Sequence, residues 1–403
     1  MKPDLNTLEF SWVTDFAELR QYSEEWAQLC ASTGADIYLT PDWLDVWWQN
    51  FGAGRSLVCL IARDSSGVLV GLLPFMIDKV RVGLFRIKIA RLAATDPHAV
   101  VFSVPVVEGC LERMLQKAAR DILVTNALAD VISFTPASAL GTILPAIQSG
   151  SIENAHFTVH DRIQGSHTVF ELPSRFEDYL ATLSKKRRGQ FRRDLRRLEE
   201  DLDLTTRLVY PNKCEFEEFA AFHNAQWQNA GHGGHFSDWR GSAAFYGDLS
   251  DRVHDKGWVW LEHMSGSQGD MATQFCLVTG QTCHWRLPAR STAPEYAGLS
   301  LGKLGLILMI RRLIGEGVTR IEAGVGSYSY KQIFGATEVP VHRLIIAPRN
   351  LFSRVRLSFL LAWERVLHLG YYRLWFGRLS LRLGKVFPMK RRPLWQSWIR
   401  SRV

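Results

Sequence analysis

The sequence predicts a mixed α/β (α+β) protein with two domains and a basic helical tail. Its 403 residues suggest two or three domains, and 47% of them are apolar, which is enough for hydrophobic cores. Helical and strand patterns alternate in a similar order in the two halves of the chain, which suggests a duplication. From residue 349 onward basic and aromatic residues become frequent and acidic residues almost disappear.

The first half begins with two predicted helices. Residues 14–30 carry apolar residues at helical spacing behind a Thr-Asp capping pair. The second helix begins at Thr40, because Pro41 suits the first helical position, and it ends at Gly52. Further patterns predict strands at 57–63, 68–77, 86–92, 99–102 and 131–135 and a helix at 109–126.

The second half repeats this order. Val169–Leu172 is a predicted strand, and a long helix from Phe176 to Asp201 follows it. Basic residues crowd this helix while its apolar residues share one stripe, so the basic side chains are expected to face outward. The later predicted elements are strands at 204–209, 257–262, 271–278 and 281–287 and helices at 215–228 and 242–255.

The stretch from Tyr296 to Gly335 is the most informative part of the sequence. A loop of small residues opens a helix that Gly315 ends, a strand at 319–322 follows, and a Gly-rich turn comes next. The first backbone N–H groups of a helix lack partners and lie at the positive end of its dipole, so they form a site for anions such as phosphate. An ordinary helix-to-strand connection has the same spacing, and both interpretations stay open.

The net charge of +8 is the sum of two unlike parts. Residues 349–403 contain 13 Lys and Arg against one acidic residue, Glu364, so the tail carries +12 and the preceding residues −4. Aromatic residues between basic ones are typical of amphipathic helices that lie on an anionic membrane surface. A helical appendage packed on the body, with solvated arginines, fits the same composition.

Composition and spacing disfavour several classes of protein. The chain has no apolar run of 18 residues and no secretory signal pattern, so no membrane-spanning helix is expected. Six scattered cysteines without a Cys-x-x-Cys pair indicate a reduced, cytoplasmic protein. His232 and His235 lack a third ligand nearby, so no metal is expected. The basic helix over 184–197 has no nucleic-acid-binding signature beside it, so no nucleic-acid partner is expected.

The order of these motifs resembles a known family. The chain is similar to the GNAT-like acetyltransferases of the cellulose-biosynthesis type, which are related to the Fem-type aminoacyltransferases. The similarity is carried by residues 40–74, the basic helix over 184–199, the loop over 296–302 and the turn over 322–334. The resemblance implies tandem GNAT-like acyltransferase domains. The expected division is an N-terminal domain at 1–165, the acyltransferase domain at 166–348 and the basic amphipathic tail at 349–403.

The implied activity is transfer of an acyl group from an acyl-thioester donor, acyl-CoA or acyl carrier protein, to an amine or hydroxyl. The acceptor is expected to be a cell-envelope glycan or lipid precursor, and the location cytoplasmic or peripheral at the inner membrane. Acyl-CoA is expected as a co-substrate, with no permanently bound cofactor. Leu301 and Ala323 depart from the family pattern, so an inactive GNAT-fold scaffold of a polysaccharide biosynthesis or export complex is the alternative.

Acyl transfer needs a donor phosphate site, stabilisation of the carbonyl oxyanion and a route for the acceptor's proton. The resemblance supplies candidates for each need. The loop residues Ser300, Leu301, Gly302 and Lys303 are expected to bind the donor. The expected catalytic residues are His284, Glu322, Tyr330 and Lys331, and the expected substrate-binding residues are Arg286 and Tyr296.

Each expected catalytic residue has an alternative without function. Lys331 would stabilise developing negative charge and Tyr330 would donate to the leaving thiolate, but a Tyr-Lys pair is often a surface feature. His284 titrates near neutrality and suits proton removal, although core histidines are common. Glu322 is a candidate base or lysine partner, or an ordinary surface carboxylate. Lys303 fits a solvated lysine equally well.

Overall fold

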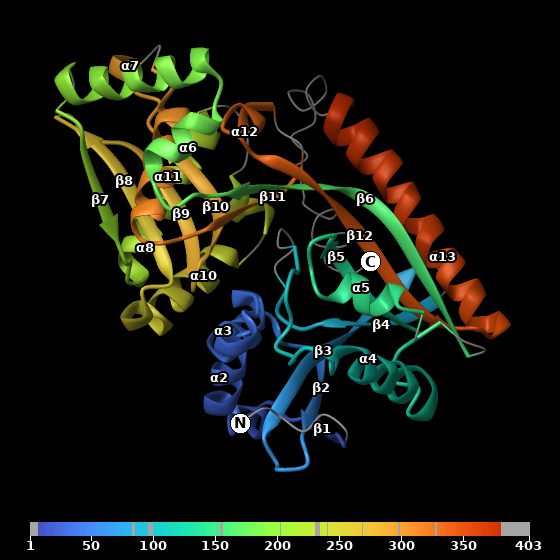
Figure 1. The fold of residues 1–403 in the computed structure, drawn as a ribbon. Helices are drawn as coiled ribbons and strands as arrows, with labels where there is room; N and C mark the ends of the chain where they lie inside the picture. The colour runs from blue at the N-terminus through green and yellow to red at the C-terminus, as the bar shows by residue number, and fades with distance from the viewer. Residues whose placement is uncertain are drawn as a thin grey trace. The chain divides into compact units, whose positions relative to one another are not determined.

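The computed structural model describes the chain as two compact units (Figure 1). One unit combines Met1–Gly165 with Pro340–Val403, and the other is Ser166–Val339. Each unit contains a mixed sheet with helices packed on it, so the predicted α/β fold class is confirmed. The described residues are 7–82, 85–95, 100–150, 152–153, 156–201, 203–229, 234–239, 241–267, 269–296, 299–326 and 329–379. Among them, no helix combines the length and apolarity that a membrane span requires.

The sheet of the first unit has the strand order β1-β2-β3-β4-β5-β12, followed by the first part of β6. From β1 to β12 in this order, neighbouring strands are antiparallel except the parallel pair β4 and β5. The strands are β1 (Glu9–Val13), β2 (Ser56–Arg63), β3 (Leu69–Val82), β4 (Phe85–Leu92), β5 (Val131–Ser138), β6 (Phe157–Glu171) and β12 (Thr337–Pro348). The helices are α1 (Phe16–Arg20), α2 (Ser23–Thr33), α3 (Pro41–Phe51), α4 (Leu111–Arg120), α5 (Ile143–Gln148) and α13 (Leu351–Leu367), with η1 (Ile37–Leu39), η2 (Asp121–Thr125) and η5 (His368–Leu379).

Helices cover both faces of this first sheet. Ala90 of β4 lies in the large apolar cluster that includes Met114 of α4, on one face. Its neighbour Ile89 lies in a smaller cluster with Leu357 and Leu360 of α13. Because successive strand residues point to opposite faces, α4 and α13 pack on opposite sides of the sheet.

The predicted helix start at residue 40 is confirmed. The hydroxyl of Thr40 accepts a hydrogen bond from the amide of Trp43 at 3.4 Å, and Pro41 is the first residue of α3. The indole N–H of Trp43 donates to the carbonyl of Ala94 at 2.6 Å inside the core. The cap and this tryptophan together fix α3 to the first unit.

The sheet of the second unit has the order β7-β8-β9-β10-β11, followed by the last part of β6. Neighbours are again antiparallel except for one parallel pair, β10 and β11. The strands are β7 (Thr205–Val209), β8 (Val259–Gly266), β9 (Gly269–Thr279), β10 (Thr282–Arg290) and β11 (Arg320–Val325). The helices are α6 (Phe176–Thr182), α7 (Lys185–Asp201), α8 (Lys213–Asn229), α9 (His235–Asp238), α10 (Ser242–Arg252), α11 (Leu301–Gly315) and α12 (Ser329–Ile333), with η3 (His254–Lys256) and η4 (Pro294–Tyr296).

The two units repeat one topology, and the similar order of elements expected in the two halves is confirmed. In each unit a helix connects two parallel strands, as β4-α4-β5 and as β10-α11-β11. The unit boundaries fall inside β6 and β12. β6 starts in the first unit and ends beside β11, whereas β12 starts in the second unit and ends beside β5. Each of these two strands therefore contributes one part to each unit.

Two sequence-based expectations in the first half are wrong in detail. The helix predicted over 14–30 is two helices, because α1 ends at Arg20 and the hydroxyl of Ser23 bonds to the Arg20 carbonyl at the start of α2. The strand predicted at 99–102 makes only a single bridge, at Val101, in the described part of this segment.

The long helix predicted over 176–201 is also two helices. Leu183 has an extended backbone, with φ −78° and ψ 153°, and its side chain is buried. The hydroxyl of Ser184 then accepts a hydrogen bond from the amide of Arg187 at 3.4 Å and opens α7. Phe191 on the inner stripe of α7 is buried, and most of the described basic side chains of α7 are exposed as expected.

Two long strands are not evident in the sequence. β6 extends the expected strand at 169–172 back to Phe157 through residues that are mostly polar and exposed, so the apolar alternation of a strand is missing. β12 falls in the connection between the Gly-rich turn and the tail. Both strands are required to complete a sheet.

Candidate active site

The candidate site lies where the parallel strands β10 and β11 separate. Their pairing has three register positions and ends with His284 opposite Glu322. β10 continues to Arg290 and β11 to Val325, with no further pairing between them in the described residues. Each strand also shows a register irregularity with its other neighbour just beyond this point. The end of the pairing, at His284 and Glu322, is termed the fork below.

A buried carboxylate lies between two histidines at the fork. Glu322 Oε1 is 3.3 Å from Nδ1 of His167, and Glu322 Oε2 is 4.0 Å from Nδ1 of His284. The amide of Gly324 also donates to Oε1, at 3.0 Å. None of the three side chains is more than 1% exposed, so the carboxylate depends on these polar neighbours in place of water. A carboxylate beside an imidazole orients the ring and stabilises its protonated form.

The sequence identifies two of these three residues. His284 and Glu322 are brought together as adjacent register partners, and the interpretation of Glu322 as a surface carboxylate is wrong. His167 is missed, because it lies in the polar part of β6, where no strand pattern marks its neighbours as buried. A histidine two residues before the predicted strand at 169–172 is the only available signal.

Lys331 lies on the opposite side of β11 from Glu322. Trp285 and Ala323 belong to the apolar cluster beneath α11, so their neighbours His284 and Glu322 face the other side of the sheet. Lys331, from α12, donates to the carbonyl of Ala323, and its ammonium lies 5.5 Å from the centre of the Trp285 ring. Burial lowers the pKa of Lys331 to about 8, although the charge of Glu322 opposes this shift. A surface Tyr-Lys pair is therefore excluded for the lysine.

A second buried contact holds Trp285 in place. Its indole N–H donates to Oε1 of Gln274 in β9 at 3.0 Å. A Cβ added to Gly305 of α11 would lie 2.5 Å from Nε2 of Gln274, so only glycine allows this amide so close to the helix. A chain of packed contacts thus runs from Gly305 through Gln274 and Trp285 to the ammonium of Lys331.

The predicted donor loop forms the start of α11. Ser300 is its N-cap, and the amides of Lys303 and Leu304 both donate to the Ser300 carbonyl, at 2.8 and 3.0 Å. Leu301 is buried, whereas a Cβ added to Gly302 would meet no atom within 4 Å. The first turn has no acidic residue, and Lys303 is exposed. The space beside Gly302 is open, and the helix dipole favours an anion there.

The other predicted residues are more scattered. Arg286 donates to the hydroxyl of Tyr246 in α10 at 3.1 Å, on the sheet face of His284. Tyr296 is buried beside α11, and its hydroxyl makes no hydrogen bond to the described residues. Tyr330 is exposed, unlike Lys331 beside it. His235 lies in α9, and His232 lies outside the described residues.

The equivalent point of the first unit has different chemistry. The parallel pairing of β4 and β5 ends with Arg91 opposite Ser133. Arg91 is buried and bonds to Asp78 at 2.7 Å and to Thr95 at 3.1 Å. The cavity beside Arg91 measures only about 10 Å³. A structural ion pair thus occupies the position that the carboxylate and histidine occupy in the second unit.

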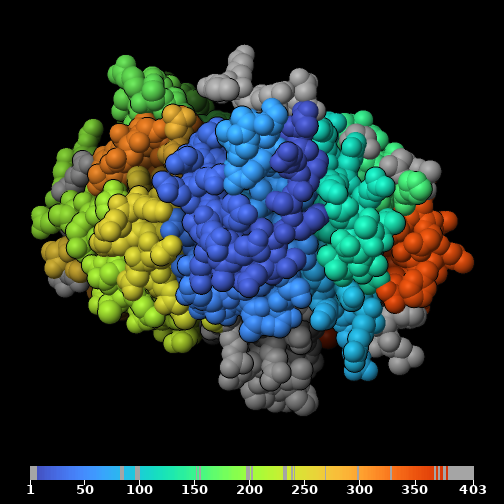
Figure 2. Space-filling model, turned by 90° about the horizontal axis from the view of Figure 1, so that it is seen from below, coloured from blue at the N-terminus to red at the C-terminus, as the bar shows by residue number. Residues whose placement is uncertain are grey.

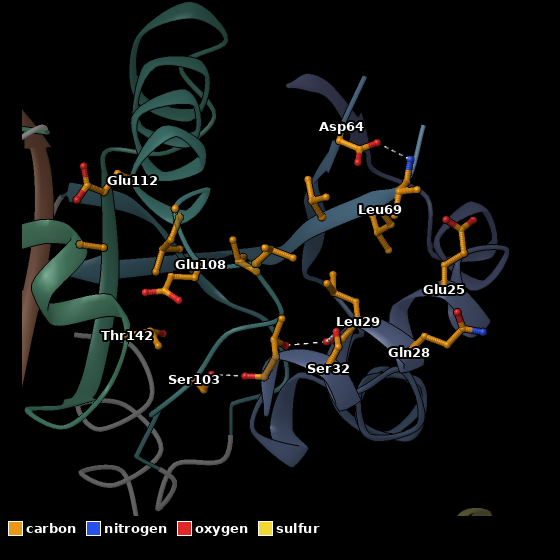
Figure 3. A pocket seen from close by; sticks show the side chains of 18 of the residues that line it. Glu25, Gln28, Leu29, Ser32, Asp64, Leu69, Ser103, Glu108, Glu112 and Thr142 are labelled. Atoms are coloured by element: carbon orange, nitrogen blue, oxygen red, sulfur yellow. Dashed lines mark hydrogen bonds between the residues drawn. The ribbon is translucent and has the colours of Figure 1, made fainter. Parts of the chain in front are cut away.

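The first unit also contains an open cavity of about 1530 Å³ (Figure 3). Figure 3 shows carboxylates on both of its sides, with Glu25 and Asp64 opposite Glu108 and Glu112. Glu112 lies in the first turn of α4, the counterpart of α11. These negative charges make the cavity unsuitable for a phosphate-bearing donor. In Figure 2 the residues in blue belong to the N-terminal part of the first unit.

Residues 185–332 match the family model described as acetyltransferase (GNAT) domain. This part of the chain is thus similar to GNAT acetyltransferase domains. It contains α11, both sides of the fork on β10 and β11, and Lys331. The first unit lies outside the matched residues, in agreement with the different chemistry at its own strand ends.

Solved structures are similar to the chain at low sequence identity, and one of them, FemX, shares its fold. The crystal structure of FemX is 10% identical and has a TM-score of 0.57, with coverage of 83% of this chain and 96% of that chain. The C-terminal domain of a putative lysylphosphatidylglycerol synthetase from Agrobacterium fabrum is 11% identical, with coverage of 86% and 96% and a TM-score of 0.49. L-PGS from Bacillus licheniformis is 13% identical, with coverage of 84% and 96% and a TM-score of 0.49. No curated protein matches the chain.

Proposed function

We propose that this protein is an acyltransferase that moves an acyl group from an acyl-thioester donor to an amine or hydroxyl of a cell-envelope glycan or lipid precursor. The observation that carries the proposal is the position of the fork inside the matched acetyltransferase domain, with a buried carboxylate between two histidines on one side and a buried lysine on the other. The donor would be acyl-CoA or acyl carrier protein, since both present a phosphopantetheine arm.

In this proposal His284 removes the acceptor's proton. The amine or hydroxyl attacks the thioester carbonyl, the proton passes to the imidazole, and the carbon–sulfur bond breaks to release the thiolate. Glu322 orients His284 and stabilises the imidazolium, and His167 holds the other carboxylate oxygen. The imidazolium returns the proton to the thiolate, either directly or through Tyr330, which donates its own proton and regains one from the imidazolium. Each atom and charge is thereby balanced without a metal or redox group.

Lys331 would stabilise negative charge that develops during the transfer. Its ammonium is held by the carbonyl of Ala323 and by the Trp285 ring, so it needs little rearrangement. The strand edges beyond the fork would pair with an extended donor arm, as peptides add to open sheet edges. The start of α11, with Ser300 to Lys303, would receive the donor's phosphates. Arg286 and Tyr296 would contact the substrates.

The acceptor class rests on the motif resemblance to the cellulose-biosynthesis type of GNAT-like protein, carried by residues 296–302 and 322–334. A glycan or lipid precursor of the envelope is made on or near the inner membrane. The proposed location is therefore the cytoplasmic side of that membrane, with peripheral attachment.

Donor binding and turnover test this function. Calorimetry with acetyl-, octanoyl- and palmitoyl-CoA should show saturable binding to the full chain, and Lys331→Ala should abolish thiol release while the variant remains folded. Lys303→Ala should weaken binding without abolishing turnover. Treatment of the product with hydroxylamine separates an ester from an amide. Absence of binding to every thioester, with Lys331→Ala indistinguishable from wild type in cells, would leave the scaffold interpretation.

A further inference from the structure

The outer face of α13 is apolar where a surface helix normally carries polar residues. α13 packs on the first sheet through Leu357 and Leu360, and its inner face also includes Glu364 (Figure 1). At 100° per residue, Val355, Phe359 and Val366 point almost directly away from this inner face. The ridge formed by Leu351, Phe352, Val355, Phe359, Trp363 and Val366 is 38–76% exposed at each position. In Figure 2 atoms of α13 (orange-red) reach the surface.

Water is an unfavourable environment for such a ridge. A helix that is apolar on both faces is normally covered on both faces, and a contiguous exposed apolar patch marks an interaction site. The patch continues into η5, where Leu369 and Leu374 are 55% and 50% exposed. The ridge therefore requires a partner that the described residues of the first unit do not supply.

The charges around the ridge indicate what that partner is. Arg354 and Arg365 are exposed beside it, and the Arg356 guanidinium lies 4.2 Å above the Phe352 ring. The one acidic residue of 349–403, Glu364, is buried on the inner face and bonds to Arg343 at 2.6 Å. The segment thus removes its only negative charge from the surface. Arg354 and Arg365 stay exposed beside the ridge, whereas Arg356 is half-buried and pairs with Asp130.

We propose that this ridge docks on an anionic lipid bilayer, with Phe352, Phe359 and Trp363 entering the headgroup boundary and the flanking arginines binding lipid phosphates. A second copy of the chain fits less well, because two such ridges would bring arginines together without carboxylates to pair with them. The proposal deepens and rests on the peripheral location proposed above, but binding to lipid is measured without any turnover.

Vesicle co-sedimentation of the full chain tests the proposal. Wild type should bind vesicles of three parts phosphatidylcholine to one part phosphatidylglycerol at least tenfold more tightly than vesicles of phosphatidylcholine alone, and added salt should weaken the binding. The variant Phe359→Ser/Trp363→Ser should bind at least tenfold more weakly, and Arg354→Glu/Arg365→Glu should lose the preference for anionic lipid. Ile163→Ser, which removes an apolar side chain that is 61% exposed on β6, is the matched control and should bind as wild type.

Three results would overturn the proposal. One is failure of wild type to bind the anionic vesicles, and another is equal binding by Phe359→Ser/Trp363→Ser with a native circular dichroism spectrum. The third is a dimer by light scattering that this variant dissolves, which would identify a second copy as the occupant. Donor calorimetry on the same variants distinguishes these outcomes from failure of the proposed chemistry, because the fork does not include residues of α13.

Discussion

Glu322, His167 and His284 are three ionisable side chains that the fold removes from water together. Isolated burial of a carboxylate is costly, and here the His167 imidazole and the Gly324 amide offset part of that cost at one oxygen, while His284 lies 4.0 Å from the other. An apolar residue at position 322 would avoid the cost altogether. Retention of buried ionisable groups at the end of a strand pair is therefore better explained by chemistry than by stability.

Glu322→Gln should test the role of the carboxylate directly. The amide keeps the size of the side chain but cannot stabilise an imidazolium, so we expect kcat/KM to fall by about 10²–10⁴-fold, the range of general acid–base catalysis. The measurement is thiol release over a range of pH. Glu171→Gln is the matched control, since this exposed carboxylate on β6 pairs with Arg320 away from the fork, and the activity of the variant should stay within twofold of wild type.

Lys331→Met should stabilise the protein at neutral pH. Burial lowers the pKa of Lys331 from 10.5 to about 8, so the folded protein binds this proton more weakly than the unfolded chain. The resulting cost, about 3 kcal/mol, is complete below pH 8 and fades as the pH rises toward 10.5. Loss of the hydrogen bond to Ala323 subtracts about 1 kcal/mol from the gain.

The expected gain in the free energy of unfolding is thus about 2 kcal/mol at pH 7 and close to zero at pH 10. Urea unfolding of wild type and variant at the two pH values gives both numbers. A gain that does not change with pH would show that the ammonium is not the destabilising group.

The sequence predicts most of the site residues but not how these residues are arranged in space. Spacing and resemblance identify His284, Glu322 and Lys331, yet their placement on two sides of β11 depends on strand alternation that single residues do not reveal. Gln274 and Trp285 are also missed, because a polar residue inside an apolar strand pattern gives no information about its partner. His167 depends on a strand whose sequence is polar.

Among the elements, α11 connects the donor loop to the lysine through its packing on β9. Gly305→Ala should disturb that packing, because its Cβ would lie 2.5 Å from Gln274 Nε2. We expect a loss of about 1–3 kcal/mol in unfolding free energy, as for other overpacked cores. Gly302→Ala in the same helix meets no atom and should be neutral or up to about 1 kcal/mol more stable. Equal effects of the two substitutions in urea unfolding would contradict the packing argument.

Element prediction succeeds where local signals are strong. The Thr40-Pro41 start gives α3, and apolar runs give β2, β3 and β9 within a few residues. It fails at Leu183, where an apolar residue continues the helical pattern but anchors an extended backbone in the core. It also fails for β6 and β12, because their pairing partners are distant in the sequence and their own patterns are weak.

At the scale of the whole molecule, the two units share a topology and differ in chemistry. The first unit ends its parallel strand pair with a structural Arg91–Asp78 ion pair and places acidic residues at the start of α4. The second unit has the His–Glu–His set and a helix start without acidic residues. Duplication of the fold therefore does not imply duplication of the site.

A fragment of residues 1–165 should not form a stable domain. It lacks β12, which pairs with β5 from Val341 to Ile346, and α13, which covers the cluster around Ile89. We expect a broad, non-cooperative thermal transition by circular dichroism. Fusion of residues 340–379 to the fragment through a flexible linker should restore cooperative unfolding. Cooperative unfolding of the fragment alone would mean that the first sheet does not require its last strand.

The division of β6 and β12 between the two units also sets the order in which the two sheets are completed during translation. β6 is already synthesised when β11 emerges, so the second sheet has all of its strands as soon as β11 is made. The first sheet waits for β12, which follows β5 by about 200 residues, or roughly 10–40 s of translation. The unit that is begun first is therefore finished last, and its β5 edge stays open for that interval.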